Sequence, residues 1–418
     1  MKLTKLVFTA LALFLSSFTG YAISDPVATI KVESGEFERI DTPLSLEIDA
    51  VTRINEAELK LYEVVDGIHV PVAVQFSPGE HRYMHWILTG TTGPDQMRIF
   101  VLKREKAVLP EGEMRIEKEN GAYIFFSGNK PVLQYNSGVT MPPEGTNPAY
   151  QRSGYIHPLY APNSAVLTNI QPSDHLHHYG IWNPWTKTTF RGEEIDFWNL
   201  AKGEGRVRFS GLISLNQGDV FSSLQVRHEH VAWPYSLQET VAMNEMQQIK
   251  VFNRNDGSFL IDIYSRLSPV EKLILEEYRY GGFVLRATEN WTNQNSYLYT
   301  SEGLDRDNAD GQRARWVVVS GDNPEGKASI MMMGNPSNYN HPEPVRVWNS
   351  NARRGRGDHF INFSPTRNTQ WILNPGINYS LRYRMLVFDG EMDDEQAEKI
   401  WNDFSNPPAI LIEKQPGR

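Results

Sequence analysis

Short runs in which apolar and polar residues alternate cover most of the chain. In the N-terminal part, residues 44–48, 59–62 and 70–74 show this period of two, and Asp66-Gly67 is a hairpin turn signal between two of the runs. Residues 97–102 predict a further strand, and a polar stretch follows it. We therefore expect a small β-sandwich at residues 23–120, with the boundary near residues 105–125.

The same pattern continues through the rest of the chain. Strands are predicted at residues 122–126, 207–215, 224–233, 248–253, 259–267, 283–290, 314–319, 328–333 and 379–388. Only one run has a helical period, and it begins at the capping residue Asp393 and continues through Trp401 to Phe404. We predict an all-β protein in which residues 121–418 form a large antiparallel β-sandwich or jelly-roll-like domain with a short C-terminal helix.

Two long segments lack a clear period. Residues 136–175 and 334–376 are rich in Pro, Asn and Gly, and they also contain aromatic residues. Loops of this length in a compact domain are usually functional or disordered, and aromatic content favours ordered ones. We expect them to contribute to a functional site.

The first 22 residues read as an export signal. Lys2 and Lys5 precede a largely apolar run, and Gly20-Tyr21-Ala22 offers a cleavage site. The apolar run is too short to cross a membrane, so no membrane span is expected. The chain has no cysteine, which excludes disulfides and thiolate chemistry, and export without disulfides predicts a periplasmic location.

Charge narrows the classes of partner. The net charge of −9 argues against general nucleic-acid binding, which requires a basic face. It leaves room for a local arginine cluster that binds an anionic substrate. The aromatic content of 11% includes ten tryptophans, which stack on sugar faces or pack in a core, and composition does not choose between these two uses.

The densest polar cluster runs from Asp174 to Trp182 and contains His175, His177 and His178. On a strand, His175 and His177 would share one face, whereas Asp174 and His178 would point to the other. Imidazoles beside a carboxylate suit acid–base catalysis or a divalent metal, although a purely structural hydrogen-bonding cluster is also open. No cofactor is certain, and the candidate ligands of a metal are Asp174, His175, His177 and His230, the last from the pair His228 and His230 on a predicted strand.

Further candidates surround this cluster in the sequence. Glu194, Asp196 and Trp198 would share one face of a strand, and the glycines before Arg286 indicate a close backbone approach or a bulge. Arg313 and Arg315 share a face, which suits a carboxylate clamp. The candidate substrate-binding residues are Trp182, Asp196, Trp198, Arg286, Glu302 and Arg315. No nucleotide-binding, esterase or zinc-peptidase motif occurs.

Several segments together resemble the PmoA-like family of secreted bacterial proteins linked to polysaccharide utilisation. The matching segments are residues 155–160, 174–182, 196–198, 281–286, 301–303, 335–338 and 381–390. The family commonly has proline between the first histidine and the histidine pair, and arginine after the pair. This chain has Leu176 and Tyr179 at those places.

The resemblance implies a carbohydrate-active lyase. Some similar proteins resemble dehydratases that remove water from the uronic acid at the non-reducing end of ulvan oligosaccharides, which leaves a 4,5-unsaturated sugar. That reaction needs a base at C5, an acid at O4 and a cation at the carboxylate. The candidate base is His177 or His178, the candidate acid is Tyr179 or His157, and the candidate clamp is Arg286 or Arg315.

Three other functions stay open. A glycoside hydrolase would need two carboxylates at a pocket, such as Glu194 or Asp196 with Glu289 or Glu302. A sugar isomerase of the mutarotase type is compatible with a large β-sandwich and a histidine pair. A non-catalytic glycan-binding protein would use the tryptophans alone. The expected partner is an oligosaccharide in each case, and the sequence does not indicate an oligomeric state.

Overall fold

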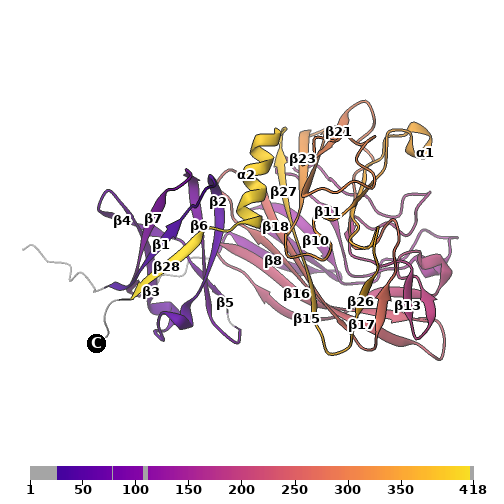
Figure 1. The fold of residues 1–418 in the computed structure, drawn as a ribbon, viewed down its shortest axis with the longest axis horizontal. Coiled ribbons are helices and arrows are strands. Elements are labelled where there is room, and N and C mark those ends of the chain that lie inside the picture. Colours follow the sequence, from indigo (N-terminus) through magenta and orange to yellow (C-terminus); the bar gives the residue numbers. More distant parts are fainter. Residues whose placement is uncertain (1–25, 78, 107–111, 415–418) are drawn as a thin grey trace, which may run out of the picture.

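Antiparallel strands make up most of the computed structural model (Figure 1), which describes residues 26–77, 79–106 and 112–414. The expected export signal lies outside these residues. Neither α-helix of the described ranges has the length and apolar character that a membrane span requires.

The N-terminal part is a small sandwich of two sheets. A five-stranded sheet has the order β28-β1-β7-β3-β4, and a three-stranded sheet has the order β2-β6-β5. Their apolar faces meet in one core, which includes Ile30, Leu44 and Trp86. The strands are β1 (Pro26–Glu33), β2 (Arg39–Glu47), β3 (Leu59–Val65), β4 (Ile68–Val72), β5 (Gln75–Ser77), β6 (Tyr83–Thr92), β7 (Met97–Arg104) and β28 (Ala409–Lys414).

The large sandwich has two eight-stranded sheets, which we call the front sheet and the back sheet. The front sheet contains, in order, β24 (Val345–Val347), β25 (Phe360–Phe363), β20 (Phe283–Arg286), β12 (Ile181–Trp182), β11 (Tyr155–Leu159), β10 (Lys130–Asn136), β9 (Ala122–Ser127) and β8 (Met114–Glu119). The back sheet contains, in order, β15 (Gly205–Asn216), β16 (Phe221–Ala232), β17 (Thr240–Phe252), β18 (Phe259–Pro269), β27 (Tyr379–Asp389), β23 (Gly326–Gly334), β22 (Trp316–Asn323) and β21 (Ser296–Thr300).

A smaller sheet and a few helical segments complete the fold. The four-stranded sheet has the order β14 (Glu193–Ile195), β13 (Thr188–Phe190), β19 (Leu273–Leu275) and β26 (Trp371–Leu373). The α-helices are α1 (Ala352–Gly355) and α2 (Asp394–Ser405), and the short 3₁₀ segments are Ile48–Ala50, Glu56–Glu58, Pro148–Tyr150 and Leu200–Lys202. The predicted all-β class, with a small N-terminal sandwich, a large sandwich and a short C-terminal helix, is confirmed.

The main core lies between the front and back sheets. Ile181 and Leu285 of the front sheet and Ile249 and Ile263 of the back sheet belong to one buried cluster. Because side chains alternate along a strand, the neighbours of these residues point to the outer faces. Trp182 and Val284 accordingly lie in a separate aromatic cluster on the outer face of the front sheet.

The helix α2 covers part of the outer face of the back sheet. Asp393 accepts a hydrogen bond from the Gln396 amide and forms a capping box, as the sequence predicted. Ile400 and Trp401 pack against Trp316 and Met331 of the sheet. In Figure 1 the helix lies between the two sandwiches.

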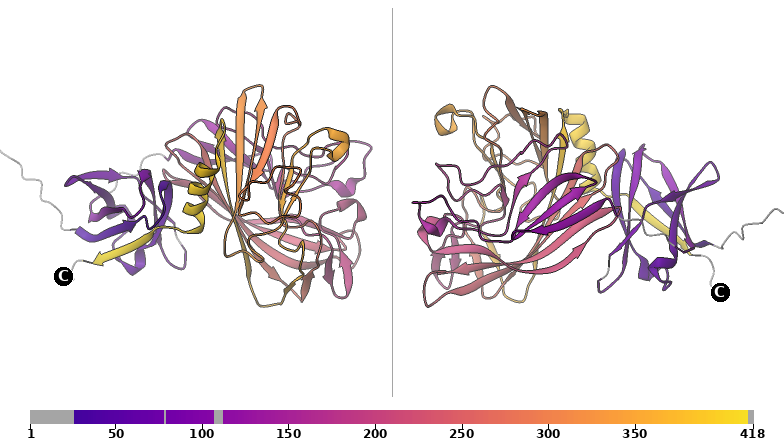
Figure 2. Two further views of the ribbon diagram at one scale, coloured as in Figure 1. Left: turned by 45° about the horizontal axis from the view of Figure 1, so that its top comes forward. Right: turned by 180° about the vertical axis from the view of Figure 1, so that it is seen from behind.

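The end of the chain returns to the N-terminal sandwich. The last strand, β28, pairs with β1 at the edge of the five-stranded sheet, and Figure 2 shows it reaching across from α2. The strand β8 already pairs with β9 of the front sheet, before residue 121. Arg39 of the small sandwich meets Asp403 of α2 at 3.2 Å. The pairing of β28 with β1 and the contact between Arg39 and Asp403 therefore join the C-terminal end of the chain to the small sandwich.

Candidate active site

A cleft of about 140 Å³ opens on the outer face of the front sheet. It is lined by His175, His177, His178, Trp198, Asn199, Arg279, Tyr280, Arg346, Trp348, Arg353 and Phe360. The residues come from five segments that are far apart in the sequence, and the strand order β24-β25-β20-β12 brings those segments together.

The three histidines lie on tight turns and not on a strand. The amide of His175 donates to the Pro172 carbonyl at 2.8 Å, and the amide of His178 donates to the His175 carbonyl at 2.9 Å. The predicted alternation of faces is therefore wrong, because the turns fold all three rings to one side. Ring centroids lie 5.5 Å apart for His175 and His177, 4.8 Å for His177 and His178, and 4.5 Å for His175 and His178.

A glycine makes the step from these turns into β12 possible. Gly180 has φ +58°, and a Cβ on it would lie 2.2 Å from the Ile156 carbonyl oxygen of the neighbouring strand. No side chain fits there, so the chain passes close to β11 and then enters β12 at Ile181. The histidines are thus attached directly to a central strand of the front sheet.

His178 is the deepest of the three rings. Its side chain is 2% exposed, and it packs on Phe360 at 5.2 Å and on Trp182 at 5.4 Å between ring centroids. Burial, together with the neighbouring His177 and His175, holds its pKa well below the usual value. The ring is therefore neutral at neutral pH.

His177 is half-buried and also neutral. Burial, followed by the nearby His175, lowers its pKa to about 4. Its ring stacks on Tyr150 with centroids 6.4 Å apart. A neutral imidazole in a cleft has a free lone pair, so His177 can accept a proton.

His175 is held in one tautomer. The Arg353 guanidinium donates to His175 Nε2, and a guanidinium has no lone pair to offer in return. The proton of a neutral His175 therefore lies on Nδ1, which faces Asp174 Oδ1 at 3.3 Å. Burial and Arg353 lower the pKa of His175, and Asp174 opposes them.

Two arginines pack on Trp348, and of these Arg353 lines the cleft whereas the predicted clamp Arg286 does not. The Arg353 and Arg286 guanidinium carbons lie 4.7 and 4.8 Å from the Trp348 ring centroid. Arg286 is buried and donates to Asp358 Oδ2 at 2.5 Å, while its Nε and Nη1 have no hydrogen-bond partner among the residues that the structure describes. The lining of the cleft contains Arg279, Arg346 and Arg353, and this positive charge suits an anionic ligand.

The loop that carries Arg353 is held in place by side chains from elsewhere. Arg353 and Arg354 have φ values of +54° and +62°, a region that residues other than glycine seldom adopt. Ser350 donates from its amide and its hydroxyl to Asp307, at 2.7 and 2.9 Å. The side-chain Nδ2 of Asn293 donates to the Ser350 carbonyl at 2.9 Å. The loop therefore presents Arg353 in a fixed position.

Asp196 positions a second wall of the cleft. Its carboxylate accepts from the amides of Trp198 and Asn199, each at 2.8 Å, and pairs with Lys202 at 3.0 Å. Burial alone would raise its pKa, but the hydrogen bonds from Asn199 and Lys202 lower it overall. Asp196 is thus an ionised cap of the turn that presents Trp198 and Asn199, and it does not itself line the cleft.

Tyr280 is a functional candidate that sequence reasoning passed over. Its hydroxyl accepts from Asn199 Nδ2 at 3.3 Å, and its ring lies 4.7 Å from that of Trp198. Burial raises its pKa, so the hydroxyl keeps its proton. It directly precedes Gly281-Gly282, and a Cβ on Gly282 would lie 2.9 Å from the Phe363 carbonyl oxygen. This is the close approach that the glycines predicted.

Other lining residues also lacked a specific signal. Asn199, Arg279, Arg346, Trp348 and Phe360 were not predicted as site residues. Three of them lie in residues 334–376, the long segment expected to be functional, and that was the only sequence signal for them. Arg353 lies in the same segment.

Three predicted residues near the histidines lie outside the cleft lining. The Tyr179 hydroxyl donates to the Tyr150 carbonyl and accepts from Gln171 Nε2 at 2.7 Å. His157 Nδ1 contacts the Thr168 hydroxyl at 2.9 Å. Trp182 supports His178 from beneath. None of the three residues lines the cleft.

Three further candidates lie elsewhere in the fold. Arg315 pairs with Glu398 of α2 and lies 3.7 Å from Glu302. His230 is in the interior of the sandwich, where Nε2 lies 3.0 Å from Glu245 Oε2. The structure therefore does not bring Arg315, Glu302 or His230 to the histidine cluster.

The donor set does not fit a resident metal ion. His175 is engaged through both nitrogens, by Arg353 and by Asp174, which leaves His177 and His178 as imidazole donors at the cleft. Among the described residues, no group of three or more His, Asp, Glu or Cys side chains has an arrangement that would hold a metal. We derive no chemical step through a metal.

Comparison with known proteins identifies a family but no reaction. A model described as "Family of unknown function (DUF6807)" matches residues 125–402, which include the whole front-sheet site. No curated protein matches the chain.

Similar solved structures belong to proteins of several activities. One is a protein in glycosyl hydrolase family 38 from Enterococcus faecalis, with 7% identity and a TM-score of 0.43 over 92% of this chain and 47% of that one. A galactose mutarotase related enzyme from Lactobacillus acidophilus has 9% identity and a TM-score of 0.35, over 67% of this chain and 100% of that one. A heparan sulfate lyase mutant from Pedobacter heparinus has 9% identity and a TM-score of 0.34, over 70% of this chain and 38% of that one.

The chain thus spans about half the length of the first of these proteins. Identities and TM-scores this low carry no inference about activity.

Proposed function

The chain belongs to the family DUF6807, whose function is unknown, so membership in the family does not indicate a reaction. We therefore propose a reaction from the residues of the cleft. The protein is a carbohydrate-active hydro-lyase that removes water from a uronic acid at the non-reducing end of an oligosaccharide. The product carries a double bond between C4 and C5 of that sugar.

One observation carries this proposal: neutral imidazoles and arginines share a cleft with aromatic faces. His177 supplies a proton acceptor, Arg279, Arg346 and Arg353 supply positive charge, and Trp198 and Trp348 supply flat apolar surfaces. Aromatic faces pack on sugar rings, and arginine binds carboxylates through paired hydrogen bonds. The combination suits a sugar acid that loses a proton from carbon.

The elimination can be written with these groups. His177 takes the proton from C5, and the electron pair of the C5–H bond forms the C4–C5 double bond. The C4–O4 bond breaks, and O4 leaves as water after it receives the proton of the Tyr280 hydroxyl. An arginine at the carboxylate stabilises the negative charge that develops on the carboxylate oxygens as C5 loses its proton.

The bound substrate would itself strengthen the base. Burial and cationic neighbours depress the pKa of His177 in the free protein. A carboxylate bound in the cleft adds a negative charge close to the ring, which favours the protonated imidazole and raises its pKa. The base is therefore free before the substrate binds and more basic once it has bound.

A glycoside hydrolase receives no support from this geometry. The lining of the cleft, as far as the described residues form it, contains no Asp or Glu. The nearest carboxylates are engaged, since Asp174 lies 3.1 Å from Arg356 and Asp196 caps a turn. A hydrolase needs two available carboxyl groups on either side of the scissile bond.

Cleft size and the family resemblance support the proposed substrate class. The small volume suits one terminal sugar better than the middle of a chain. The resemblance to PmoA-like proteins supports an ulvan-type uronate, and the sequence features of an export signal support action in the periplasm.

The proposal is tested with purified protein and uronate-terminated ulvan oligosaccharides. We expect ultraviolet absorbance from the new double bond and a mass that falls by one water without chain shortening. His177→Ala should lower kcat by roughly 10²–10⁴-fold, as expected for loss of a general base.

His157→Ala is the matched control. His157 is also substantially buried, and burial also lowers its pKa to about 4, but it does not line the cleft. It should keep its kcat. Shorter products without ultraviolet absorbance from a double bond would show that the protein is a hydrolase and not a lyase. An unchanged mass with altered anomeric or epimeric composition would replace it with an isomerase.

A further inference from the structure

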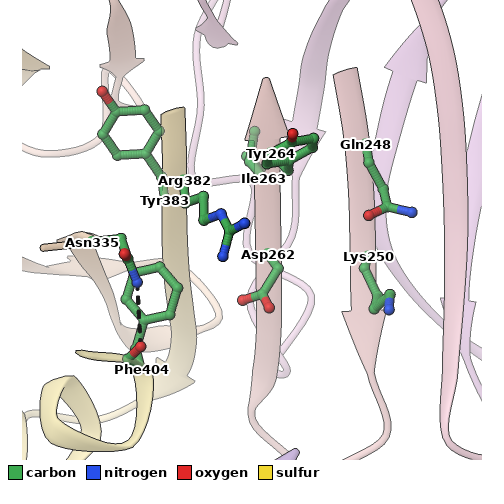
Figure 3. Close-up of a pocket in the computed structure, with 9 residues that line it drawn as sticks. All are labelled: Gln248, Lys250, Asp262, Ile263, Tyr264, Asn335, Arg382, Tyr383 and Phe404. Atoms are coloured by element: carbon green, nitrogen blue, oxygen red, sulfur yellow. Dashed lines mark hydrogen bonds between the residues drawn. The ribbon is translucent and has the colours of Figure 1, made fainter. Parts of the chain in front are cut away.

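A second cavity lies on the outer face of the back sheet, on the other side of the sandwich from the histidines. Its volume is about 350 Å³, and its lining residues are Gln248, Lys250, Asp262, Ile263, Tyr264, Asn335, Arg382, Tyr383 and Phe404. Figure 3 shows that adjacent strands carry them, with Gln248 and Lys250 on β17, Asp262 and Tyr264 on β18, and Arg382 on β27.

Lys250 is a half-buried cation that forms no ion pair within the described ranges. Its Nζ lies 4.3 Å from the Phe221 ring centroid and makes no hydrogen bond or ion pair with the described residues. The neighbouring Asp262 is already occupied, because Arg384 donates to its two oxygens at 2.5 and 2.8 Å. Burial lowers the pKa of Lys250, although the charge of the nearby Asp262 opposes that shift.

Two more donors in the cavity are free. The Arg382 side chain is exposed and lies over the Tyr264 ring at 5.6 Å, with no hydrogen bond to a described residue. The Gln248 side chain likewise has no partner in the described ranges. Unpaired ammonium, guanidinium and amide groups therefore face one space, which leaves their hydrogen-bonding capacity to a ligand.

The charge balance at this cavity selects an anion. The lining contains the cations Lys250 and Arg382, and the one carboxylate among its described residues, Asp262, is already paired with Arg384. This local excess of positive charge occurs in a chain whose net charge is −9. Such a patch attracts an oxyanion even when the whole protein is acidic.

The other lining groups favour an anion carried on a larger polar body. The Tyr264 hydroxyl lies 2.9 Å from the Ser380 hydroxyl, so it retains further hydrogen-bonding capacity, and the Tyr264 and Phe404 rings form apolar walls. The cavity is also larger than a bare ion needs.

We propose that this cavity binds a carboxylated or sulfated sugar unit at a site separate from the histidine cleft. Lys250 and Arg382 hold the oxyanion, and Gln248 and Tyr264 contact the hydroxyl groups. The two sites lie on opposite outer faces of the sandwich, so one saccharide unit cannot occupy both. Binding here does not depend on the proposed elimination.

Isothermal titration of the full chain tests the proposal with four compounds: glucuronate, galactose 6-sulfate, glucose and inorganic sulfate. To remove binding at the other face, the titration uses the Arg353→Gln, His177→Ala protein as background. We expect glucuronate or the sulfated sugar to bind, and glucose to bind far more weakly. Arg382→Gln should weaken that binding by roughly tenfold, the effect of one charge-assisted hydrogen bond.

Arg266→Gln is the matched control, because Arg266 is an exposed arginine on the same face of β18 but outside the cavity lining. It should bind as the background protein does. Lys250→Met, which keeps the length of the side chain, provides a second variant, and its folding is checked by thermal unfolding.

An equal loss of sugar affinity in Arg382→Gln and Arg266→Gln would overturn the proposed site. Sugar affinity unchanged in both Arg382→Gln and Lys250→Met would also overturn it. Inorganic sulfate that binds as tightly as either sugar would overturn the saccharide part. Failure of the elimination assay alone would leave the titration result, and hence this proposal, unchanged.

Discussion

At the scale of single residues, the cleft keeps its imidazoles neutral by surrounding them with apolar rings and cations. His178 lies between Phe360 and Trp182, and Arg353 fixes the tautomer of His175. A protonated imidazole would be poorly solvated there and would be repelled by the arginines. The cleft is thus prepared for an anion whose arrival offsets the positive charge.

Arg353 and its neighbour Arg354 allow a direct test of that view. The two residues share the same unusual backbone conformation, but only Arg353 lines the cleft. If Arg353 binds the substrate carboxylate, Arg353→Gln should raise KM by about tenfold or more, since a hydrogen bond to a charged group contributes about 1.5–3 kcal/mol.

Steady-state kinetics on uronate-terminated oligosaccharides measures this effect. Arg354→Gln should leave KM unchanged, because the exposed Arg354 side chain forms no hydrogen bond or ion pair with a described residue and does not line the cleft. Equal KM values for the two variants would mean that the substrate carboxylate binds another arginine of the cleft lining, Arg279 or Arg346.

At the scale of elements, short connections between strands carry the chemistry and the strands only place them. The turns at residues 172–178 enter β12, and the loop at residues 349–357 leads into β25. These strands are separated by β20 alone in the front sheet, so the two loops meet above it. Rigid strands with variable loops are a common basis for binding sites.

The strand β28 shows a different use of an element, because it completes a sheet more than 300 residues away in sequence. Ile410 and Ile412 pack against the core of the small sandwich, while Leu411 is 46% exposed. Ile412→Ala should lower the free energy of unfolding by about 1–3 kcal/mol, somewhat less than for a fully buried site. Leu411→Ala should change it by less than about 0.5 kcal/mol.

Urea unfolding of the full chain measures both effects. A similar small loss for the two variants would mean that β28 contributes through its backbone pairing and not through its side chains.

At the scale of the whole molecule, polar contacts join the two sandwiches firmly. Arg39 donates to the Asn406 carbonyl at 2.7 Å, besides its pair with Asp403. Gln75 of the small sandwich accepts from the amides of Val220 and Phe221 beside the back sheet. The N-terminal sandwich thus contacts the back sheet, on the side of the large sandwich opposite the histidine cleft.

Buried histidines throughout the molecule make its stability depend on pH. Burial lowers the pKa to about 3 for His85 and His359 and to about 4 for His157 and His177. In the unfolded chain these groups titrate near 6.5, so below that pH the unfolded state binds protons that the folded state does not. Stability should be fully present above pH 6.5 and should fall as the pH drops from 6.5 towards 4.

Each such histidine adds a slope of roughly 1.4 kcal/mol per pH unit within that window. Urea unfolding at a series of pH values checks this. His157→Gln should reduce the slope of the unfolding free energy against pH by roughly 1.4 kcal/mol per pH unit, the contribution of one proton. A stability that stays constant from pH 6.5 to pH 4.5 would contradict the burial of these rings in neutral form.

Local patterns in the sequence determined the elements and the class of the fold. The alternation at residues 259–267 and 379–388 predicted strands that became β18 and β27, and Asp393 predicted the start of α2. These features depend on neighbours within a few residues, so a single chain reveals them. The histidine segment was also visible, because three of its rings cluster within four positions.

Only the tertiary structure decided which residues share the cleft. Tyr280, Trp348 and Arg353 join the histidines because β20, β25 and β24 stack beside β12. Arg315 instead pairs with Glu398 of the helix α2, and Glu302 lies beside Arg315, although their sequence pattern was as favourable. Strand order is set by packing between segments far apart in the chain, whereas sequence periodicity reports only the face on which a residue lies.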